Sequence, residues 1–125
     1  MKFKTDRIRE EWESGNINKT LVDKINIWLS WLKYRSPDYE PTITDIYRTE
    51  QEYKDIYNDT DKKPGIHSYW RAVDIRTNDM PDKLAYDSAQ FFNSIPYDFK
   101  RPKMKTCIYG DDRHKDHLHI QQVYK

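Results

Sequence analysis

Residues 65–77, GIHSYWRAVDIRT, contain the pattern from which the fold can be predicted. Side chains of an extended chain alternate between two faces, so this segment places Asp74 on one face and Val73 and Ile75 on the other. We therefore predict a β-strand over 70–77. Its aliphatic face would pack into the core, and its carboxylate would point into a cleft.

A second alternating segment, HLHIQQVY, occupies residues 117–124. His117 and His119 share one face of this predicted strand, and the aliphatic residues between and after them share the other. The segment 103–110, KMKTCIYG, is also predicted to be a strand, and the polar loop 111–116 joins the two. A short connection of this kind favours an antiparallel pair.

The remaining elements follow from apolar periodicity and capping signals. Apolar residues recur at helical spacing in 20–34 and 81–95, which predicts two amphipathic helices, the first capped by Thr20. β-Branched and aromatic residues predict a strand over 42–47. A Thr-x-x-Glu capping box opens a predicted helix over 49–59. The order of elements predicts an α+β domain, with helices packed on a small, mostly antiparallel sheet.

Composition indicates a single folded domain spanning residues 1–125. Charged residues make up 34% of the chain, but the net charge is only +1 and aromatic residues reach 14%, which favours a folded core over disorder. The near-neutral charge gives no overall attraction to nucleic acid or to a membrane, so we expect neither as a partner. The lone Cys107 is expected in the core and His114 in a solvated loop. The oligomeric state is left open.

Histidines and carboxylates cluster in the two alternating segments and predict a single metal site. His67 and Asp74 would be ~23 Å apart in an extended chain, so His67 must lie on a loop that folds back over the strand. Catalytic zinc typically has three His or carboxylate ligands and a water. Asp116 could lie beside the metal without binding it. Alternation makes His117 as good a ligand as His119, and such histidine pairs also occur in strands that bind no metal.

These stretches resemble the VanY-type zinc peptidases. That family comprises D-alanyl-D-alanine carboxypeptidases and phage L-alanyl-D-glutamate endolysins, and it shares its zinc-site architecture with the Hedgehog signalling domain. Its pattern is Ser-x-His, two residues, Gly, one residue, Ala, one residue, Asp, and later an acidic residue, two residues and His. The match implies that His67, Asp74 and His119 are zinc ligands and that Asp116 is the general base, with Ala72 at the alanine position.

The family also has an upstream Arg followed by Gln, which IYRTEQEYKDIY matches with Arg48 and Gln51. By this resemblance Arg48 would stabilise the oxyanion or hold a substrate carboxylate, and Gln51 would bind substrate. The chain departs from the pattern at Gly65, where the family usually has Ser, and at Trp70, where it has Gly. Trp70 would reshape the cleft and contact substrate. His117 would line the cleft and hydrogen-bond a transition-state oxygen.

The resemblance implies a zinc-dependent peptidase that hydrolyses peptidoglycan stem peptides containing D-amino acids. It covers residues 42–122, so 41–125 would form the catalytic core and 1–40 an N-terminal helical segment. With no visible secretory signal, the protein is expected to be made in the cytoplasm and to act on the cell wall after release.

Two alternatives remain open. One is a catalytically inactive, zinc-stabilised binding module on the same scaffold. The other is a metal-dependent nuclease, since DHLHI is similar to the start of a His-Asn-His motif. That motif requires a further Asn and His, and only six residues follow His119.

Overall fold

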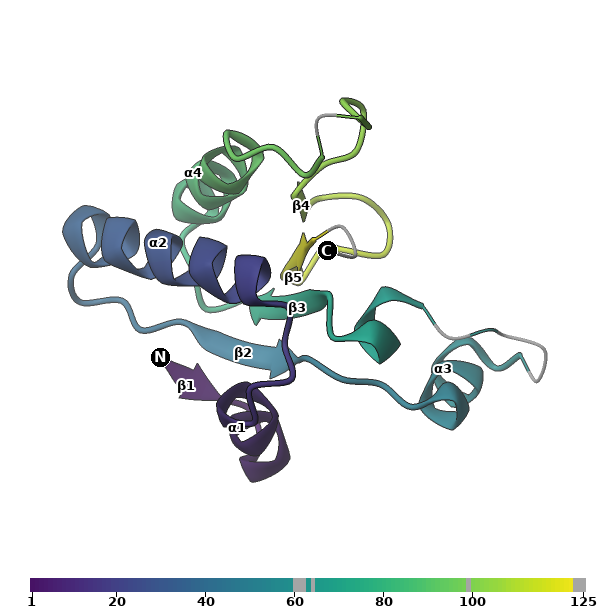
Figure 1. Cartoon of the computed structure of the whole chain (residues 1–125). Coiled ribbons are helices and arrows are strands. Elements are labelled where there is room, and N and C mark those ends of the chain that lie inside the picture. The colour runs from purple at the N-terminus through teal and green to yellow at the C-terminus, as the bar shows by residue number, and fades with distance from the viewer. Residues whose placement is uncertain (60–62, 64, 99, 123–125) are drawn as a thin grey trace.

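The computed structural model describes residues 1–59, 63, 65–98 and 100–122. These residues form four α-helices, one 3₁₀ helix and five strands (Figure 1). In chain order the elements are β1 (Lys2–Phe3), α1 (Asp6–Glu13), α2 (Lys19–Arg35), β2 (Thr42–Asp45), α3 (Glu50–Tyr57), the 3₁₀ helix η1 (Ile66–Tyr69), β3 (Ala72–Arg76), α4 (Asp82–Asn93), β4 (Cys107–Ile108) and β5 (His117–Gln121).

The five strands form one sheet in the order β1–β2–β3–β5–β4. β1 runs parallel to β2, and the other three neighbouring pairs are antiparallel. The predicted α+β class is thus confirmed, and the sheet is mixed. β3 and β5 pair over five residues, a register that sets Asp74 opposite His119.

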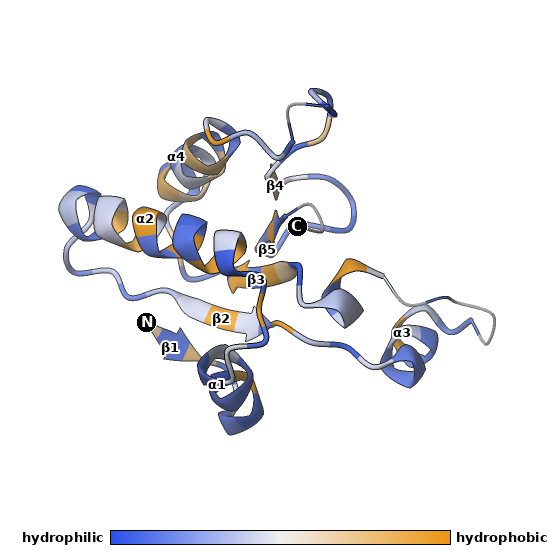
Figure 2. Ribbon diagram, in the orientation of Figure 1, coloured by the Kyte–Doolittle hydropathy of each residue, from blue (hydrophilic) through white to orange (hydrophobic). Residues whose placement is uncertain are grey.

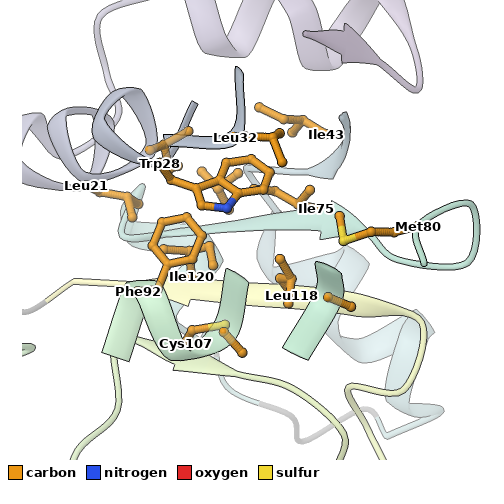
Figure 3. Packing of buried hydrophobic residues seen from close by; sticks show 14 of the residues in the cluster. Leu21, Trp28, Leu32, Ile43, Ile75, Met80, Phe92, Cys107, Leu118 and Ile120 are labelled. Atoms are coloured by element: carbon orange, nitrogen blue, oxygen red, sulfur yellow. The ribbon is translucent and has the colours of Figure 1, made fainter. Parts of the chain in front are cut away.

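Helices α2 and α4 cover one face of this sheet (Figure 1). Trp28 of α2 and Phe92 of α4 are fully buried, with ring centroids 5.4 Å apart. Figure 3 shows both rings among aliphatic side chains of the sheet, such as Ile75 and Ile120. β3 is hydrophobic along most of its length (Figure 2). Burying one large apolar side chain, such as Phe92 or Ile75, stabilises the fold by about 1.5–3 kcal/mol. The face of the sheet that α2 and α4 cover is therefore the hydrophobic core.

The predicted alternation in the two strands is confirmed. Val73 and Ile75 of β3 and Leu118 of β5 belong to the hydrophobic cluster beneath α2 and α4. Asp74 and His119 consequently point to the opposite face, toward η1 and the segment that precedes β5. The two strands therefore separate a hydrophobic layer from a polar one.

The predicted helices are present, but α2 has a different cap from the predicted one and α4 begins one residue later than predicted. The Thr-x-x-Glu capping box at the start of α3 is confirmed, with both of its hydrogen bonds present. The cap of α2 is Asn18 and not Thr20, because the Asn18 side chain accepts the hydrogen bond from the Leu21 N–H. Pro81 precedes α4 as its N-cap.

Residues 1–40 are more than a helical segment. They begin with β1, which adds a strand to the sheet, and α1 is a separate helix capped by the Thr5 side chain. Leu21 of α2 is fully buried in the same core as the strands. The N-terminal part of the chain therefore builds the core together with the remainder.

The predicted strand over 103–110 is reduced to the two residues of β4. Before β4, the Thr106 hydroxyl donates to the Ile95 carbonyl, which fixes this segment against the end of α4. Residues 123–124 of the predicted last strand lie outside the described residues. Within the described ranges, no helix combines the length and the hydrophobicity that crossing a membrane requires.

Candidate metal centre

Three buried side chains from three elements converge on the polar face of the sheet. His67 comes from η1, Asp74 from β3 and His119 from β5, and one ligand atom of each lies within 4.8 Å of the others. The Asp74 Oδ1 is 3.4 Å from His67 Nε2 and 3.0 Å from His119 Nδ1. The exposed fractions are 2%, 3% and 6%, respectively. This group could hold a metal ion.

His67 reaches the strand because the chain turns sharply between η1 and β3. Trp70, which ends η1, has a left-handed backbone with φ of 59°. The His67 backbone N–H donates to the Tyr53 hydroxyl at 3.0 Å. The ring nitrogen Nδ1 lies 2.9 Å from the Ile46 carbonyl oxygen. The predicted fold-back of His67 is confirmed.

The His119 ring is held by Gln121, two residues further along β5. The Gln121 Nε2 donates to the Lys105 carbonyl at 2.7 Å, which turns the Oε1 of the same amide toward His119. That Oε1 lies 3.2 Å from His119 Nε2 and accepts a hydrogen bond from its N–H. The Nδ1 of His119 is left facing Asp74.

The donor set fits a cation. A carbonyl or amide oxygen can only accept, so Nδ1–H of His67 and Nε2–H of His119 donate outward. In the neutral rings, the lone pairs of the other two nitrogens then face the Asp74 carboxylate. Such an arrangement requires a positive charge between the groups, either a proton or a metal ion. Outward hydrogen bonds of this kind also accompany most histidine ligands of metals.

The pKa shifts follow the same geometry. Burial acts to raise the pKa of Asp74, but the contacts with His67 and His119 outweigh burial and hold this pKa well below its usual range. Burial likewise acts to lower the pKa of His67, and the attraction of Asp74 outweighs it, so the pKa of His67 is raised. The carboxylate is therefore ionised and available to a cation.

A cavity of about 680 Å³ opens above this group. Arg48, Tyr53, His114 and His117 are among the residues that line it. A more polar cavity of about 350 Å³ adjoins it and contains Asp116. Arg48, Asp74 and His117 line both cavities, so the two form neighbouring parts of one cleft.

Arg48 lies beside the metal-binding group. Its Nε contacts the Asp45 Oδ2 at 2.5 Å, and its Nη2 is 3.6 Å from the Asp74 Oδ2. Burial acts to lower the pKa of Arg48, but Asp45 and Asp74 outweigh it and the pKa is raised. Arg48 is therefore a fixed positive charge at the edge of the site.

Asp116 and His117 form a hydrogen-bonded pair at the same edge. Nδ1 of His117 is 2.7 Å from Asp116 Oδ1, and its Nε2 is 3.7 Å from Asp74 Oδ2. The hydrogen bond from His117 lowers the pKa of Asp116. The Asp116 side chain is 80% exposed and lines the smaller cavity only. His117 is adjacent to the metal-binding group but is not part of it.

The structure does not bring Gln51 and Trp70, both predicted to bind substrate, to the larger cavity. Gln51 donates to Asp55 on the exposed side of α3. Trp70 stacks on Tyr47, with ring centroids 4.6 Å apart. The predicted strand 70–77 included Trp70, but Trp70 ends η1 with a positive φ and β3 begins at Ala72, so Trp70 does not share the strand face of Asp74.

His114, expected to be a solvated loop residue, lies in the site. Its ring centroid is 5.1 Å from that of His119 and 5.2 Å from that of His117. Its Nδ1 is 2.6 Å from the Asp111 Oδ1, and its side chain is 19% exposed. All four histidines of the chain therefore meet at one place. The sequence signal available for His114 was an aspartate three residues earlier, which can orient the ring.

The chain matches no family model, no curated protein and no solved structure. The class of protein is therefore defined by the fold and the site alone. It is an α+β domain with a buried His–Asp–His group that could bind a metal ion at the floor of an open cavity.

Proposed function

We propose that the protein is a zinc-dependent peptidase that hydrolyses peptidoglycan stem peptides containing D-amino acids. The observation that carries this proposal is the convergence of His67, Asp74 and His119 at the floor of a cavity large enough for a peptide segment. Three ligands of these types, beside an open space, are typical of catalytic zinc, whereas structural zinc is usually closed by four protein ligands.

Zinc is the metal that best suits this donor set. Two imidazoles and one carboxylate form a common catalytic zinc site, and oxygen-only sites are the preference of magnesium and calcium. Zinc bound here would supply a water ligand with a pKa of about 7 and would polarise a scissile carbonyl.

The surrounding residues have chemistry that suits peptide hydrolysis. Asp116 is the proposed general base, which would take a proton from the attacking water and deliver it to the leaving amine. Arg48 is held in place by Asp45 and would offset negative charge on the reacting oxygen. His117 lines both parts of the cleft and could donate a hydrogen bond to the same oxygen.

The resemblance to the VanY-type peptidases, and with it a Hedgehog-type zinc fold, is part of this proposal. Both departures from the family pattern can be compared with the local backbone and contacts. The family glycine falls at Trp70, whose φ of 59° is a conformation that glycine adopts most easily. The family serine falls at Gly65, where a Cβ would lie 2.8 Å from the Tyr53 hydroxyl. Tyr53 thus accounts for the absence of a side chain at position 65.

A binding module without catalytic activity is the second candidate. The observation that favours it is the position of Asp116, whose carboxylate is exposed and lies in the smaller cavity. A general base must come within hydrogen-bond reach of the water whose proton it takes. On this alternative the zinc would stabilise the fold and the cleft would bind a peptide without cutting it.

Incubation with defined muropeptides tests the proposal. Zinc-loaded protein, chelator-treated protein and the His119→Ala variant would each be mixed with the peptides, and the products weighed by mass spectrometry. Hydrolysis by the zinc-loaded protein alone is the expected result. Zinc and peptide binding without any change in peptide mass would instead support the binding module.

A further inference from the structure

One wall of the larger cavity is a ladder of two rings and two guanidinium groups. The rings of Tyr53 and Tyr57 on α3 are parallel within 6°, with centroids 6.2 Å apart. Arg48 lies over Tyr53 at 5.4 Å, and Arg113 lies over Tyr57 at 5.6 Å. All four residues line the cavity. The ladder starts at Arg48, beside the metal-binding group, and ends at Arg113 on the segment that precedes β5.

Among the residues that the structure describes, the lining of the cavity has an excess of positive charge. Arg48, Lys63 and Arg113 line it, and Asp74 is the one carboxylate in this described lining. Asp74 is engaged by three imidazoles, those of His67, His117 and His119, and Arg48 is engaged by Asp45. Within the described residues, neither Lys63 nor Arg113 forms an ion pair. The positive charge of the lining that is not balanced by an ion pair therefore lies on Lys63 and Arg113.

The carboxylates next to Arg113 in the chain do not neutralise its side chain. Asp111 accepts from the backbone N–H of Arg113 and lies against the His114 ring. Asp112 lies 3.7 Å from the Lys115 ammonium. The guanidinium of Arg113 instead lies over the ring of Tyr57. A guanidinium over a ring face keeps N–H groups available, and their spacing matches that of a carboxylate.

We propose that the Tyr57–Arg113 end of the cavity is a subsite for a free carboxylate of the substrate. This inference rests on the proposed function and specifies its substrate as an acidic peptide. A cavity of about 680 Å³ has the size of sites that hold drug-sized ligands. The carboxylate is therefore at most a few residues from the bond that is cut. The protein would distinguish a stem peptide with a free D-glutamate carboxylate from the same peptide with a carboxamide.

Two synthetic peptides that differ only in this carboxylate or carboxamide test the subsite. Their binding to zinc-loaded protein would be measured by calorimetry, and their hydrolysis as separate kcat and KM values. The wild type is expected to bind the acid about tenfold more tightly than the amide, the worth of one charge-assisted contact. Arg113→Gln should bind the two peptides alike, with the change in KM and not in kcat.

Arg9→Gln is the matched control, because Arg9 is an exposed arginine that lies over the Phe3 ring at 5.7 Å, outside the cavity. It should keep the tenfold preference. Raising the ionic strength from about 0.05 to 0.5 M should weaken the preference in the wild type, since screening acts on exposed charges.

The outcomes separate this inference from the proposed function. A wild type that binds neither peptide, or both equally, overturns the subsite, as does an Arg113→Gln variant that keeps the preference. Binding of the acid that depends on Arg113, with no hydrolysis, supports the subsite and contradicts the peptidase activity. Hydrolysis of both peptides with equal KM contradicts the subsite and leaves the peptidase activity supported.

Discussion

The Nδ1 of His119 and the Oδ1 of Asp74 are 3.0 Å apart, across the pairing of β5 with β3. Both residues lie within a five-residue antiparallel ladder whose other face is packed into the core. Two of the three candidate ligands are thus placed by the sheet itself. The third, His67, is placed by hydrogen bonds to Tyr53 and Ile46.

Substitution of either strand ligand should strongly weaken zinc binding at this site. We expect Asp74→Asn and His119→Ala to weaken the zinc affinity by more than about 100-fold, since loss of an outer-shell partner alone typically costs 10–100-fold. Competition with a chromophoric chelator measures the affinity. Asp116→Asn is the control and should bind zinc as the wild type does. Equal zinc affinity in all of these variants would show that the metal is bound elsewhere.

Asp116→Asn should keep zinc and lose turnover. The expected decrease in kcat is roughly 10²–10⁴-fold, the usual contribution of a general base. The measurement is the rate of muropeptide hydrolysis by zinc-loaded variant and wild type at equal metal content. Normal turnover by the variant would remove the role assigned to this carboxylate.

Gln121→Leu should weaken zinc binding without unfolding the protein. The leucine removes the acceptor for His119 Nε2–H, and the ring is then no longer held with Nδ1 toward Asp74. We expect the affinity to fall by about 10–100-fold. The ¹⁵N shifts of the His119 ring would report the loss of its single tautomer.

Gln122→Leu is the matched control for this experiment. Gln122 is the next residue, is equally buried, and donates to the Tyr97 carbonyl, away from the metal-binding group. It should lose stability in urea but keep the zinc affinity. A parallel loss of affinity in both variants would indicate a general effect of destabilisation.

The ion pair between Arg7 and Glu52 should make stability depend on pH in acid. The hydrogen bond that Glu52 accepts from Arg7 lowers the pKa of Glu52 from 4.5 to about 2. A lowered carboxyl pKa stabilises the folded state above pH 4.5, and this stabilisation is lost as the pH falls toward 2. Glu52→Gln keeps a side chain suited to the capping box and removes the charge.

Urea unfolding of the Glu52→Gln variant and the wild type measures this effect. At pH 7 the variant should be less stable by about 0.2–1 kcal/mol, because both partners are partly exposed. The difference should decrease as the pH falls from 4.5 toward 2. Glu50→Gln is the control in the same helix, with a cost of about 0.2–0.5 kcal/mol from its contact with Lys54. A difference that persists unchanged at pH 2 would contradict the assignment.

Position 70 should prefer glycine to alanine. Both substitutions remove the stacking of Trp70 on Tyr47, but only alanine retains the cost of a side chain at a φ of 59°. We expect Trp70→Gly to be more stable than Trp70→Ala by about 1–2 kcal/mol, measured by urea unfolding. The same pair of substitutions at Tyr86, which is exposed in α4, should give the opposite order by about 1 kcal/mol.

The parts of the site that were predictable are those that depend on local geometry. Strand alternation is a property of neighbouring residues, so it placed Asp74 and His119 on one face correctly. The length of an extended chain was enough to require that His67 fold back. The choice of Asn18 over Thr20 as a helix cap lies within the usual uncertainty of helix ends.

The parts that were missed depend on contacts between distant segments or on backbone conformation. His114 enters the site because its loop returns over the sheet and Asp111 orients its ring. The Tyr53 hydroxyl, on α3, accepts a hydrogen bond from the His67 backbone. Apolar periodicity predicts that Tyr53 is buried, but it does not predict this contact. Trp70 lies outside the lining of the cleft because it has a positive φ two residues before β3 begins, so it is not part of the alternating strand. None of these features has a periodic signature.

Both outer strands of the sheet, β1 and β4, contain only two residues. An outer strand presents unpaired N–H and C=O groups to which a strand from another molecule can add, and very short outer strands limit this addition. The molecule accordingly offers little template for sheet growth by other copies of itself. Such short edges favour a chain whose sheet does not extend onto other copies when the protein is concentrated or refolded.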